Sequence, residues 1–231
     1  MNQKNIIPKI SIILPCRNEE EALPFCLKQL KEIILNNNLS AEIIVSDSSQ
    51  DKSPEIANYH GAVLVKHDEK GYGLAYQEGI KVAKGIYIFM ADADNTYEFS
   101  DIIKFLNELE NGFDFVIGNR FSGKMESFSM SKERQFIGNP ILTLAINFLF
   151  NSKINDSQCG IRAIRKESFE KLNLKSKGME FASEMIIKAI KNNLRIIELP
   201  TNYKRRIGQS KLNPILDGLR HILLIIKERL I

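Results

Sequence analysis

Short apolar runs alternate with helical patterns through the first two-thirds of this 231-residue chain. Runs with the length and β-branched content of buried strands occur at 10–14, 42–46, 62–66, 86–90 and 113–118. Apolar side chains recur at helical spacing at 19–35, 53–59, 72–83 and 100–111. Strands separated by crossover helices build a mostly parallel sheet that carries helices on its faces. The sequence therefore predicts an α/β fold.

The pattern changes after residue 120. Residues 122–133 are polar, and residues 137–150 are apolar on nearly every side, so this helix is expected to be buried or to lie against lipid. Short strands are expected at 160–165 and 195–200, and helices at 166–172 and 181–192. From residue 214 a helix places apolar side chains along one side: Ile215, Leu219, Ile222, Leu223, Ile226 and Leu230. We expect one domain over 1–212, with a mobile segment and apolar helix at 122–152, and an amphipathic C-terminal helix at 213–231.

The composition limits the kinds of binding partner and the cellular compartment that are expected for this chain. The formal net charge of +4 is too small to indicate a nucleic-acid partner. Three cysteines without a C-x-x-C pair argue against a disulfide framework or a zinc site, which favours a reducing, cytoplasmic location. The apolar stretches fall short of the roughly 18 residues that span a bilayer. Any membrane contact is therefore expected to be peripheral, at the cytoplasmic face.

An acidic pair, Asp92 and Asp94, follows the predicted strand at 86–90 directly. In an extended chain, side chains two residues apart point the same way, and ligands of open parallel sheets bind beyond the carboxyl ends of the strands. Carboxylates suit the hard cations Mg²⁺ and Mn²⁺, which neutralise a departing diphosphate. The plain alternative is a polar turn with two solvated acids.

Other strand ends carry polar motifs as well. Residues 14–19 lead from the first strand into a helix, whose free N–H groups favour anions. Asp47 ends the second strand and could accept hydrogen bonds from a base or ribose. Gly71 and Gly73 permit close backbone approach, but Tyr76 stands where a dinucleotide fingerprint has its third glycine. A nicotinamide-dependent oxidoreductase is therefore excluded.

Taken in their order along the chain, these motifs resemble those of the family 2 glycosyltransferases of GT-A fold, most closely the dolichyl-phosphate or polyprenyl-phosphate sugar synthases. The matching stretches occupy residues 14–19, 45–51, 71–73, 90–94, 118–121, 156–162, 178–181 and 205–211. The resemblance extends from residue 10 to about residue 212 and implies a Rossmann-like, mostly parallel sheet flanked by helices. Two positions depart from the family pattern: Ser46 replaces an acid, and Arg17 stands where relatives often have tyrosine. In relatives both positions face the nucleotide, so the resemblance does not fix the identity of the nucleotide base.

The resemblance also implies roles for individual residues. The nucleotide-sugar site would comprise Pro15, Arg17, Glu19, Val45, Asp47, Asp92, Ala93 and Asp94. Asp92 and Asp94 would hold Mg²⁺ or Mn²⁺, and Arg120, Arg205 and Lys211 would bind phosphates of the donor or the acceptor. Asp156 matches the acidic residue that lies nearest the reacting centre in relatives, so Asp94 and Asp156 are the expected catalytic residues.

The expected reaction is an inverting displacement that moves a hexose from a UDP-glucose or GDP-mannose type donor to a polyprenyl or dolichyl phosphate. An ionised phosphate acceptor needs positioning rather than a general base, whereas a sugar hydroxyl would need one, and Asp156 is then the candidate. Two alternatives stay open. The acceptor is a soluble glycan or small metabolite, or the chain is a catalytically inactive nucleotide-sugar-binding protein.

Overall fold

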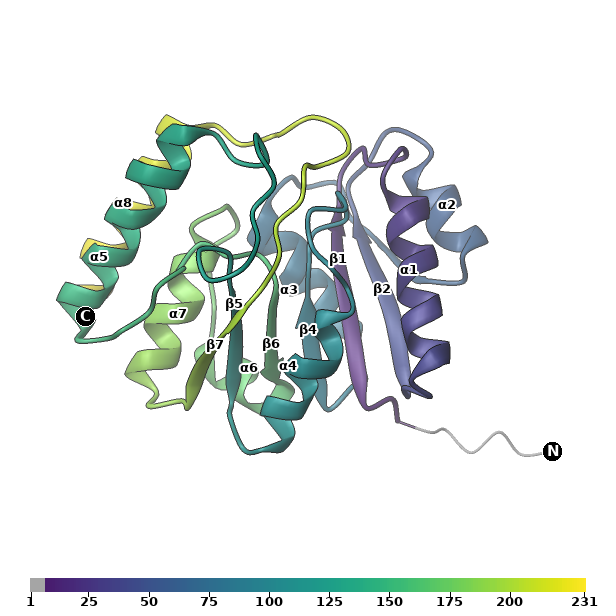
Figure 1. Ribbon diagram of the computed structural model, residues 1–231, viewed down its shortest axis with the longest axis horizontal. Coiled ribbons are helices and arrows are strands. Elements are labelled where there is room, and N and C mark those ends of the chain that lie inside the picture. Colours follow the sequence, from purple (N-terminus) through teal and green to yellow (C-terminus); the bar gives the residue numbers. More distant parts are fainter. Residues whose placement is uncertain (1–6) are drawn as a thin grey trace.

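The computed structural model describes residues 7–231 and contains the expected alternation of strands and helices (Figure 1). The strands are β1 (Ile10–Cys16), β2 (Ala41–Asp47), β3 (Val63–Lys66), β4 (Tyr87–Met90), β5 (Phe115–Asn119), β6 (Arg162–Arg165) and β7 (Ile196–Pro200). The α-helices are α1 (Leu23–Asn36), α2 (Ser53–Tyr59), α3 (Tyr72–Val82), α4 (Asp101–Glu110), α5 (Asn139–Phe150), α6 (Lys166–Leu172), α7 (Phe181–Lys191) and α8 (Pro214–Leu230). A short π-helix, Arg134–Gly138, leads directly into α5.

The strands form one seven-stranded sheet in the order β3-β2-β1-β4-β6-β5-β7. All neighbouring pairs are parallel except those of β6, which runs antiparallel to both β4 and β5. In Figure 1, α4 lies in front of the sheet and α3 behind it. The predicted α/β class, with a mostly parallel sheet between helices, is confirmed.

The strand register brings the expected site residues to one edge. Cys16 pairs with Asp47, and Ile13 pairs with Met90, so β1, β2 and β4 end next to one another. Burial of their apolar side chains holds these strands in the sheet: Ile12, Ile44 and Phe89 are all fully inaccessible to solvent. Burial on both faces is the property of parallel strands covered by helices.

The first helix begins later than its sequence pattern predicts. Its apolar spacing indicates a start at Glu19, but α1 begins at Leu23. Asn18 has a positive φ of 53°, and residues 20–22 form a turn before Pro24 enters the first helical turn. Proline is favoured in the first turn of a helix because a backbone N–H there would have no partner within the helix. The delayed start leaves Glu19 free to enter the site.

The C-terminal helix α8 packs on the protein through the side opposite its apolar face. Its buried residues are His221, Ile225 and Glu228, while the apolar side chains predicted to form one face are at least 43% exposed. His221 Nδ1 lies 2.7 Å from Ser183 Oγ of α7, and Lys191 Nζ lies 3.1 Å from Glu228 Oε2. Polar pairs therefore fix α8 to α7, and much of its apolar surface remains open.

The burial of His221 predicts a pH-dependent stability. Burial lowers its pKa from 6.5 to about 4; Asp217 opposes this shift, and Arg162 adds to it. Below pH 6.5 the unfolded chain takes up a proton that the folded protein refuses, so stability is full above that pH and falls as the pH drops toward 4. At 1.36 kcal/mol per pKa unit the loss is about 3 kcal/mol.

Urea denaturation of wild type and of His221→Asn at pH 7, 6, 5 and 4 isolates this contribution from that of the carboxylates. The wild type should lose about 3 kcal/mol more than the variant over this range. Parallel losses in the two proteins would show that His221 is not buried as described.

Candidate active site

A cavity of about 340 Å³ lies at the shared carboxyl edge of β1, β2 and β4. The segment 201–213, which connects β7 to α8 and is called the strap below, crosses this end of the sheet (Figure 1). The backbone holds it there, because Lys204 N–H donates to Thr96 O at 2.8 Å and Ile207 N–H donates to Asp94 O at 2.9 Å. The cavity is lined by Pro15, Cys16, Arg17, Glu19, Ser48, Lys70, Gly71, Tyr72, Ala75, Asp92, Ala93, Asp94, Gly178, Met179, Arg206, Lys211, Leu212, Asp217 and Arg220.

The two aspartates of the acidic motif both line this cavity. Burial, together with the Asp94 charge, raises the pKa of Asp92 to about 7, although Arg206 and Arg120 act in the opposite direction. Asp94 is 6% exposed, and its Oδ1 accepts hydrogen bonds from Thr96 N–H at 3.1 Å and Thr96 Oγ1 at 2.6 Å. Because burial and the neighbouring Asp94 charge both disfavour the ionised form of Asp92, the site would gain from added positive charge.

Oxygen donors of this kind fit a hard divalent cation. Mg²⁺ binds through one or two carboxylates and keeps water and phosphate oxygens in its remaining positions. Among residues 7–231, no three histidine, cysteine, aspartate or glutamate side chains group as ligands, so Asp92 and Asp94 would be the protein's main contribution. Because the ion competes with the proton on Asp92, its binding would release that proton.

Basic side chains of the strap meet the acids in the cavity. Arg206 Nη2 lies 3.0 Å from Asp94 Oδ2 and 3.7 Å from Glu19 Oε1. Lys211 Nζ donates to Glu19 Oε1 and, at 3.1 Å, to Asn18 O. Burial raises the pKa of Glu19, and Lys211 partly opposes that effect. The cationic side chains of Arg206 and Lys211 thus both lie at the buried Glu19 carboxylate, in the wall of the cavity.

Most of the residues assigned to the nucleotide by resemblance meet here. Pro15, Arg17, Glu19 and Ala93 line the cavity together with the acidic pair. Asp47 is absent from this lining and is fully buried at the end of β2: its Oδ2 accepts Ser49 N–H at 3.2 Å, while its Oδ1 has no hydrogen-bond partner within the described chain. A buried acceptor without a partner is costly, so a ligand donor at this point would stabilise the site.

Val45 has a different environment from the one expected of a nucleotide contact. It is fully buried in β2 within the hydrophobic core and does not line the cavity. Val45 precedes the carboxyl end of β2 by two residues, so its side chain packs in the core rather than at the edge of the sheet where the cavity opens.

Arg120 and Asp156 bind each other rather than line the cavity. Arg120 Nε donates to Asp156 Oδ2 at 2.7 Å and Nη2 donates to Oδ1 at 2.7 Å, while the Arg120 backbone N–H adds a third bond. Asp156 is fully buried, and the Arg120 side chain is 6% exposed. Burial alone would lower the pKa of Arg120, but the Asp156 carboxylate holds it well above its usual value. The expected base and the expected phosphate ligand therefore form an internal ion pair.

Arg205 points away from the acidic pair. Its Nε donates to Ser127 O at 2.7 Å, and its guanidinium lies 5.3 Å from the centre of the Phe128 ring. Arg205 thereby holds the 122–130 segment against the strap and is absent from the cavity lining, whereas Arg206 is part of it. In an extended segment, neighbouring side chains take opposite sides, and the sequence alone could not indicate which arginine faces inward.

Three basic residues of the cavity are not among those that the sequence assigned to the site. Lys70, Arg206 and Arg220 line it beside the expected Arg17 and Lys211. Lys70 adjoins the Gly71 motif, and Arg206 adjoins Arg205, so adjacency to a recognised motif was the available signal. Arg220 lies on α8, one helical turn after Asp217, and no motif of the sequence marks it.

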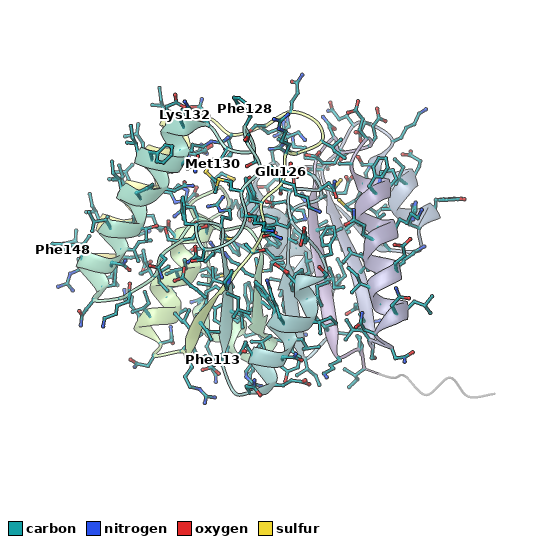
Figure 2. All side chains as sticks on the ribbon, viewed as in Figure 1. Phe113, Glu126, Phe128, Met130, Lys132 and Phe148 are labelled. Atoms are coloured by element: carbon teal, nitrogen blue, oxygen red, sulfur yellow. The ribbon has the colours of Figure 1, made fainter. Side chains whose placement is uncertain are left out.

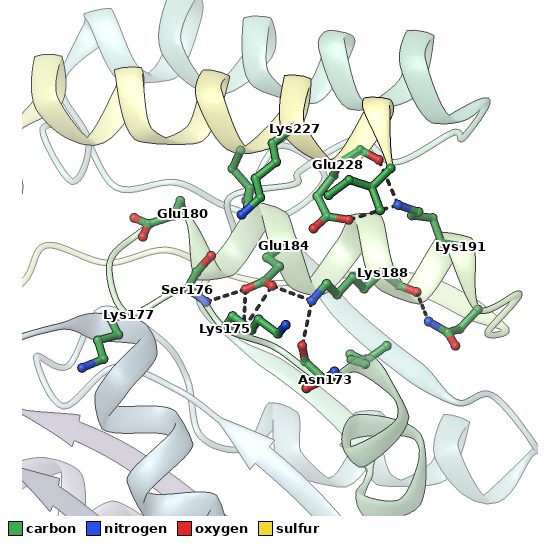
Figure 3. A pocket seen from close by; sticks show the side chains of 14 residues that line it. Asn173, Lys175, Ser176, Lys177, Glu180, Glu184, Lys188, Lys191, Lys227 and Glu228 are labelled. Carbon is green, nitrogen blue, oxygen red and sulfur yellow. Dashed lines mark hydrogen bonds and ion pairs between the residues drawn. The ribbon is translucent and has the colours of Figure 1, made fainter.

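A second cavity, of about 570 Å³, lies between α7, α8 and the segment 173–177 (Figure 3). Two ion pairs lie in its wall: Lys188 pairs with Glu184 at 2.7 Å, and Lys191 pairs with Glu228 at 3.1 Å. Glu184 also accepts the backbone N–H groups of Lys175 and Ser176. These contacts tie α7 to its neighbours, and the acidic pair lies in the smaller cavity.

Comparison with known proteins identifies the family of this chain. Residues 11–173 match the family described as Glycosyl transferase family 2. The Haloferax volcanii low-salt glycan biosynthesis hexosyltransferase Agl6 is 37% identical over 219 residues, which are 94% of this chain and 53% of that protein. The chain thus spans about half the length of this relative. A dolichyl-phosphate hexose transferase of the same organism is 27% identical over 90% of this chain and 89% of that protein.

Solved structures share the fold. Glucosyl-3-phosphoglycerate synthase of Mycobacterium tuberculosis, in complex with Mn²⁺, UDP-glucose and phosphoglyceric acid, aligns with a TM-score of 0.76 and 17% identity over 97% of this chain and 80% of that chain. Mannosyl-3-phosphoglycerate synthase of Rubrobacter xylanophilus aligns with a TM-score of 0.74 and 19% identity, covering 96% of this chain and 74% of that chain. The chain therefore belongs to glycosyl transferase family 2 and has the GT-A fold.

Proposed function

We propose that the protein is a metal-dependent, inverting hexosyltransferase. Its donor is a nucleotide-diphosphate sugar of the UDP-glucose or GDP-mannose type, and its acceptor is a polyprenyl or dolichyl phosphate at a membrane surface. The observation that carries the proposal is the composition of the 340 Å³ cavity, where Asp92 and Asp94 share the lining with Arg17, Lys70, Arg206, Lys211 and Arg220. An acidic pair suits the metal, and the surrounding cations suit two phosphorylated substrates.

The state of Asp156 supports a phosphate acceptor. Both of its oxygens accept hydrogen bonds from Arg120, and it is fully buried. A carboxylate committed in this way is poorly placed to take a proton from a sugar hydroxyl. A phosphate acceptor is already largely ionised near neutral pH, so it needs positioning by cations more than a base.

The remaining roles in binding the metal, the nucleoside and the acceptor fall to different residues in and near the cavity. Asp92 and Asp94 would hold Mg²⁺ or Mn²⁺, which would neutralise the diphosphate as the glycosidic bond breaks. Asp47, whose Oδ1 has no hydrogen-bond partner among residues 7–231, would accept a hydrogen bond from the nucleoside. Arg17, Lys70 and Arg220 would hold the acceptor phosphate on the cavity wall.

An exposed apolar surface supports a lipid acceptor. α5 packs against α8 (Figure 1). Seven apolar residues of these two helices are each more than half exposed. One of them, Phe148, is labelled at the outer side of α5 in Figure 2. This α5–α8 apolar surface consists of Ile141, Leu144, Phe148, Ile215, Leu219, Leu223 and Leu230. Asp217 and Arg220 of α8 line the cavity, so the apolar surface begins within one helical turn of the site. No helix in the described part of the chain is long and apolar enough to span a bilayer.

The double variant Phe148→Ser/Leu223→Ser tests the membrane contact. These side chains are 84% and 67% exposed, so their loss should spare folding. Burying a Phe or Leu side chain in lipid contributes about 1.5–3 kcal/mol when complete, so vesicle binding should weaken at least about tenfold in a co-sedimentation assay. Tyr59→Ser on α2, with an 87% exposed ring, is the matched control and should bind like wild type. Unchanged binding of the double variant would remove the lipid assignment.

A second candidate acceptor is a small phosphorylated metabolite, because the solved synthase of similar fold is in complex with phosphoglyceric acid. The two acceptors separate in one assay. The protein is incubated with labelled UDP-glucose or GDP-mannose and Mn²⁺, with polyprenyl phosphate or with 3-phosphoglycerate. We expect label to enter the organic phase only with polyprenyl phosphate. A water-soluble glycosylated product would favour the metabolite, and donor binding without transfer would favour an inactive binding protein.

A further inference from the structure

Both carboxylate oxygens of Asp94 are already occupied in this structure. Its Oδ1 accepts two hydrogen bonds from Thr96, and its Oδ2 lies 3.0 Å from Arg206 Nη2. The strap residue that follows, Ile207, donates its backbone N–H to Asp94 O at 2.9 Å. The Arg206 guanidinium thus stands at the oxygen that a divalent ion would need.

Arg206 itself is only partly satisfied in this position. Its second acidic neighbour, Glu19 Oε1, is 3.7 Å away and already accepts Lys211 Nζ. The Nε of Arg206 is buried without a hydrogen-bond partner within residues 7–231. Arg120, by contrast, uses both its Nε and its Nη2 on one carboxylate. Arg206 therefore keeps donors for a further acceptor, and its side chain, 27% exposed, borders the cavity.

We infer that Arg206 couples metal binding to nucleotide-diphosphate binding, an inference that rests on the proposed donor. Without ligands, Arg206 is the counter-ion of Asp94. A metal ion and the guanidinium exclude each other at Asp94 Oδ2, since both are cations that need the same oxygen. A diphosphate offers Arg206 several charged oxygens, which suit a forked guanidinium better than one shared carboxylate. When Arg206 turns to the diphosphate, Asp94 becomes available to the metal.

The coupling has a thermodynamic consequence. The metal alone must displace Arg206, so it binds weakly, whereas the nucleotide diphosphate removes the competitor and strengthens metal binding. Linkage requires the reverse as well: the metal strengthens nucleotide binding by the same factor. Removing the guanidinium should therefore raise the affinity for metal alone and reduce the gain produced by the nucleotide.

Mn²⁺ binding to the full chain, followed by the electron paramagnetic resonance signal of free Mn²⁺, measures this without turnover. The titration is run alone and with saturating UDP or GDP, for wild type, Arg206→Ala and Arg205→Ala. We expect Arg206→Ala to bind Mn²⁺ alone about tenfold more tightly than wild type. Its gain from the nucleotide should be about tenfold smaller than that of wild type, a change within the usual range of coupling between sites.

Arg205→Ala is the matched control, because it removes the same charge from the adjacent strap residue, whose side chain contacts Ser127 and Phe128. It should keep wild-type Mn²⁺ affinity within about twofold, as expected for a screened surface charge. Thermal unfolding of each variant checks that the fold is intact.

The outcomes separate this inference from the proposed function. If wild type binds Mn²⁺ and nucleotide together but Arg206→Ala behaves like wild type, the role of Arg206 is overturned and the proposed donor stands. Equal tightening in both arginine variants would show a general charge effect and would also overturn it. Wild type that binds neither Mn²⁺ nor nucleotide would overturn the proposed function and this inference together.

Discussion

Asp94→Asn is expected to lower hexose transfer by about 10²–10³-fold or more, the usual cost of removing one group that stabilises developing charge. The side chain lines the cavity, and its Oδ2 is the oxygen that would meet the metal. Asparagine keeps the shape and can still accept the Thr96 hydrogen bonds, so folding should be retained. The pKa of Asp92 is raised by burial and then by the Asp94 charge, so removing that charge also lessens the shift. The assay is turnover of labelled nucleotide sugar with saturating Mn²⁺.

The control for Asp94→Asn is Asp68→Asn, which removes an equal charge from an exposed position outside the cavity. It should transfer sugar at the wild-type rate. Full turnover by Asp94→Asn, or undiminished wild-type turnover in excess chelator, would refute the metal assignment.

Asp156→Ala is expected to lower the free energy of unfolding by about 3–5 kcal/mol, because it leaves the buried Arg120 charge without a partner. Asp156 is fully buried, and Arg120 donates three hydrogen bonds to it. The measurement is urea denaturation, followed by circular dichroism. Turnover should fall along with stability, since the pair fixes the chain between β5 and β6.

Asp114→Ala gives the comparison for Asp156→Ala. Asp114 also faces arginines, at 3.6–3.7 Å, but it is 21% exposed. A more exposed pair of this kind contributes about 0–1 kcal/mol. Should Asp156→Ala keep wild-type stability and lose only its turnover, Asp156 would be a catalytic base after all, as the family resemblance implies.

Local patterns in the sequence predicted the elements of the fold well. The alternation of strands and helices, the apolar β1 and β4, and the acidic pair at the end of β4 all follow from short-range spacing. The antiparallel β6 could not be predicted this way. It enters the sheet between β4 and β5 after a segment of more than forty residues, and strand direction in that case depends on long-range packing rather than on local pattern.

The site residues that follow a strand could be predicted from local motifs, whereas those placed by long-range packing could not. Residues that follow a strand directly, such as Asp92 and Arg17, do line the cavity. Residues on irregular segments were harder, because the choice between Arg205 and Arg206 depends on which side of the strap faces inward. The Arg120–Asp156 pair joins side chains 36 positions apart, and only the folded sheet brings them together. Arg220 likewise reaches the cavity through the packing of α8 on α7.

The metal and the diphosphate can be located directly by anomalous diffraction from crystals grown with Mn²⁺ and UDP-glucose or GDP-mannose. The account predicts one Mn²⁺ peak in the 340 Å³ cavity, with an Asp94 oxygen at about 2.0–2.2 Å, as in other small divalent sites, and Arg206 moved from Asp94 to the diphosphate. A nucleotide bound outside this cavity, or a Mn²⁺ peak remote from Asp92 and Asp94, would contradict it.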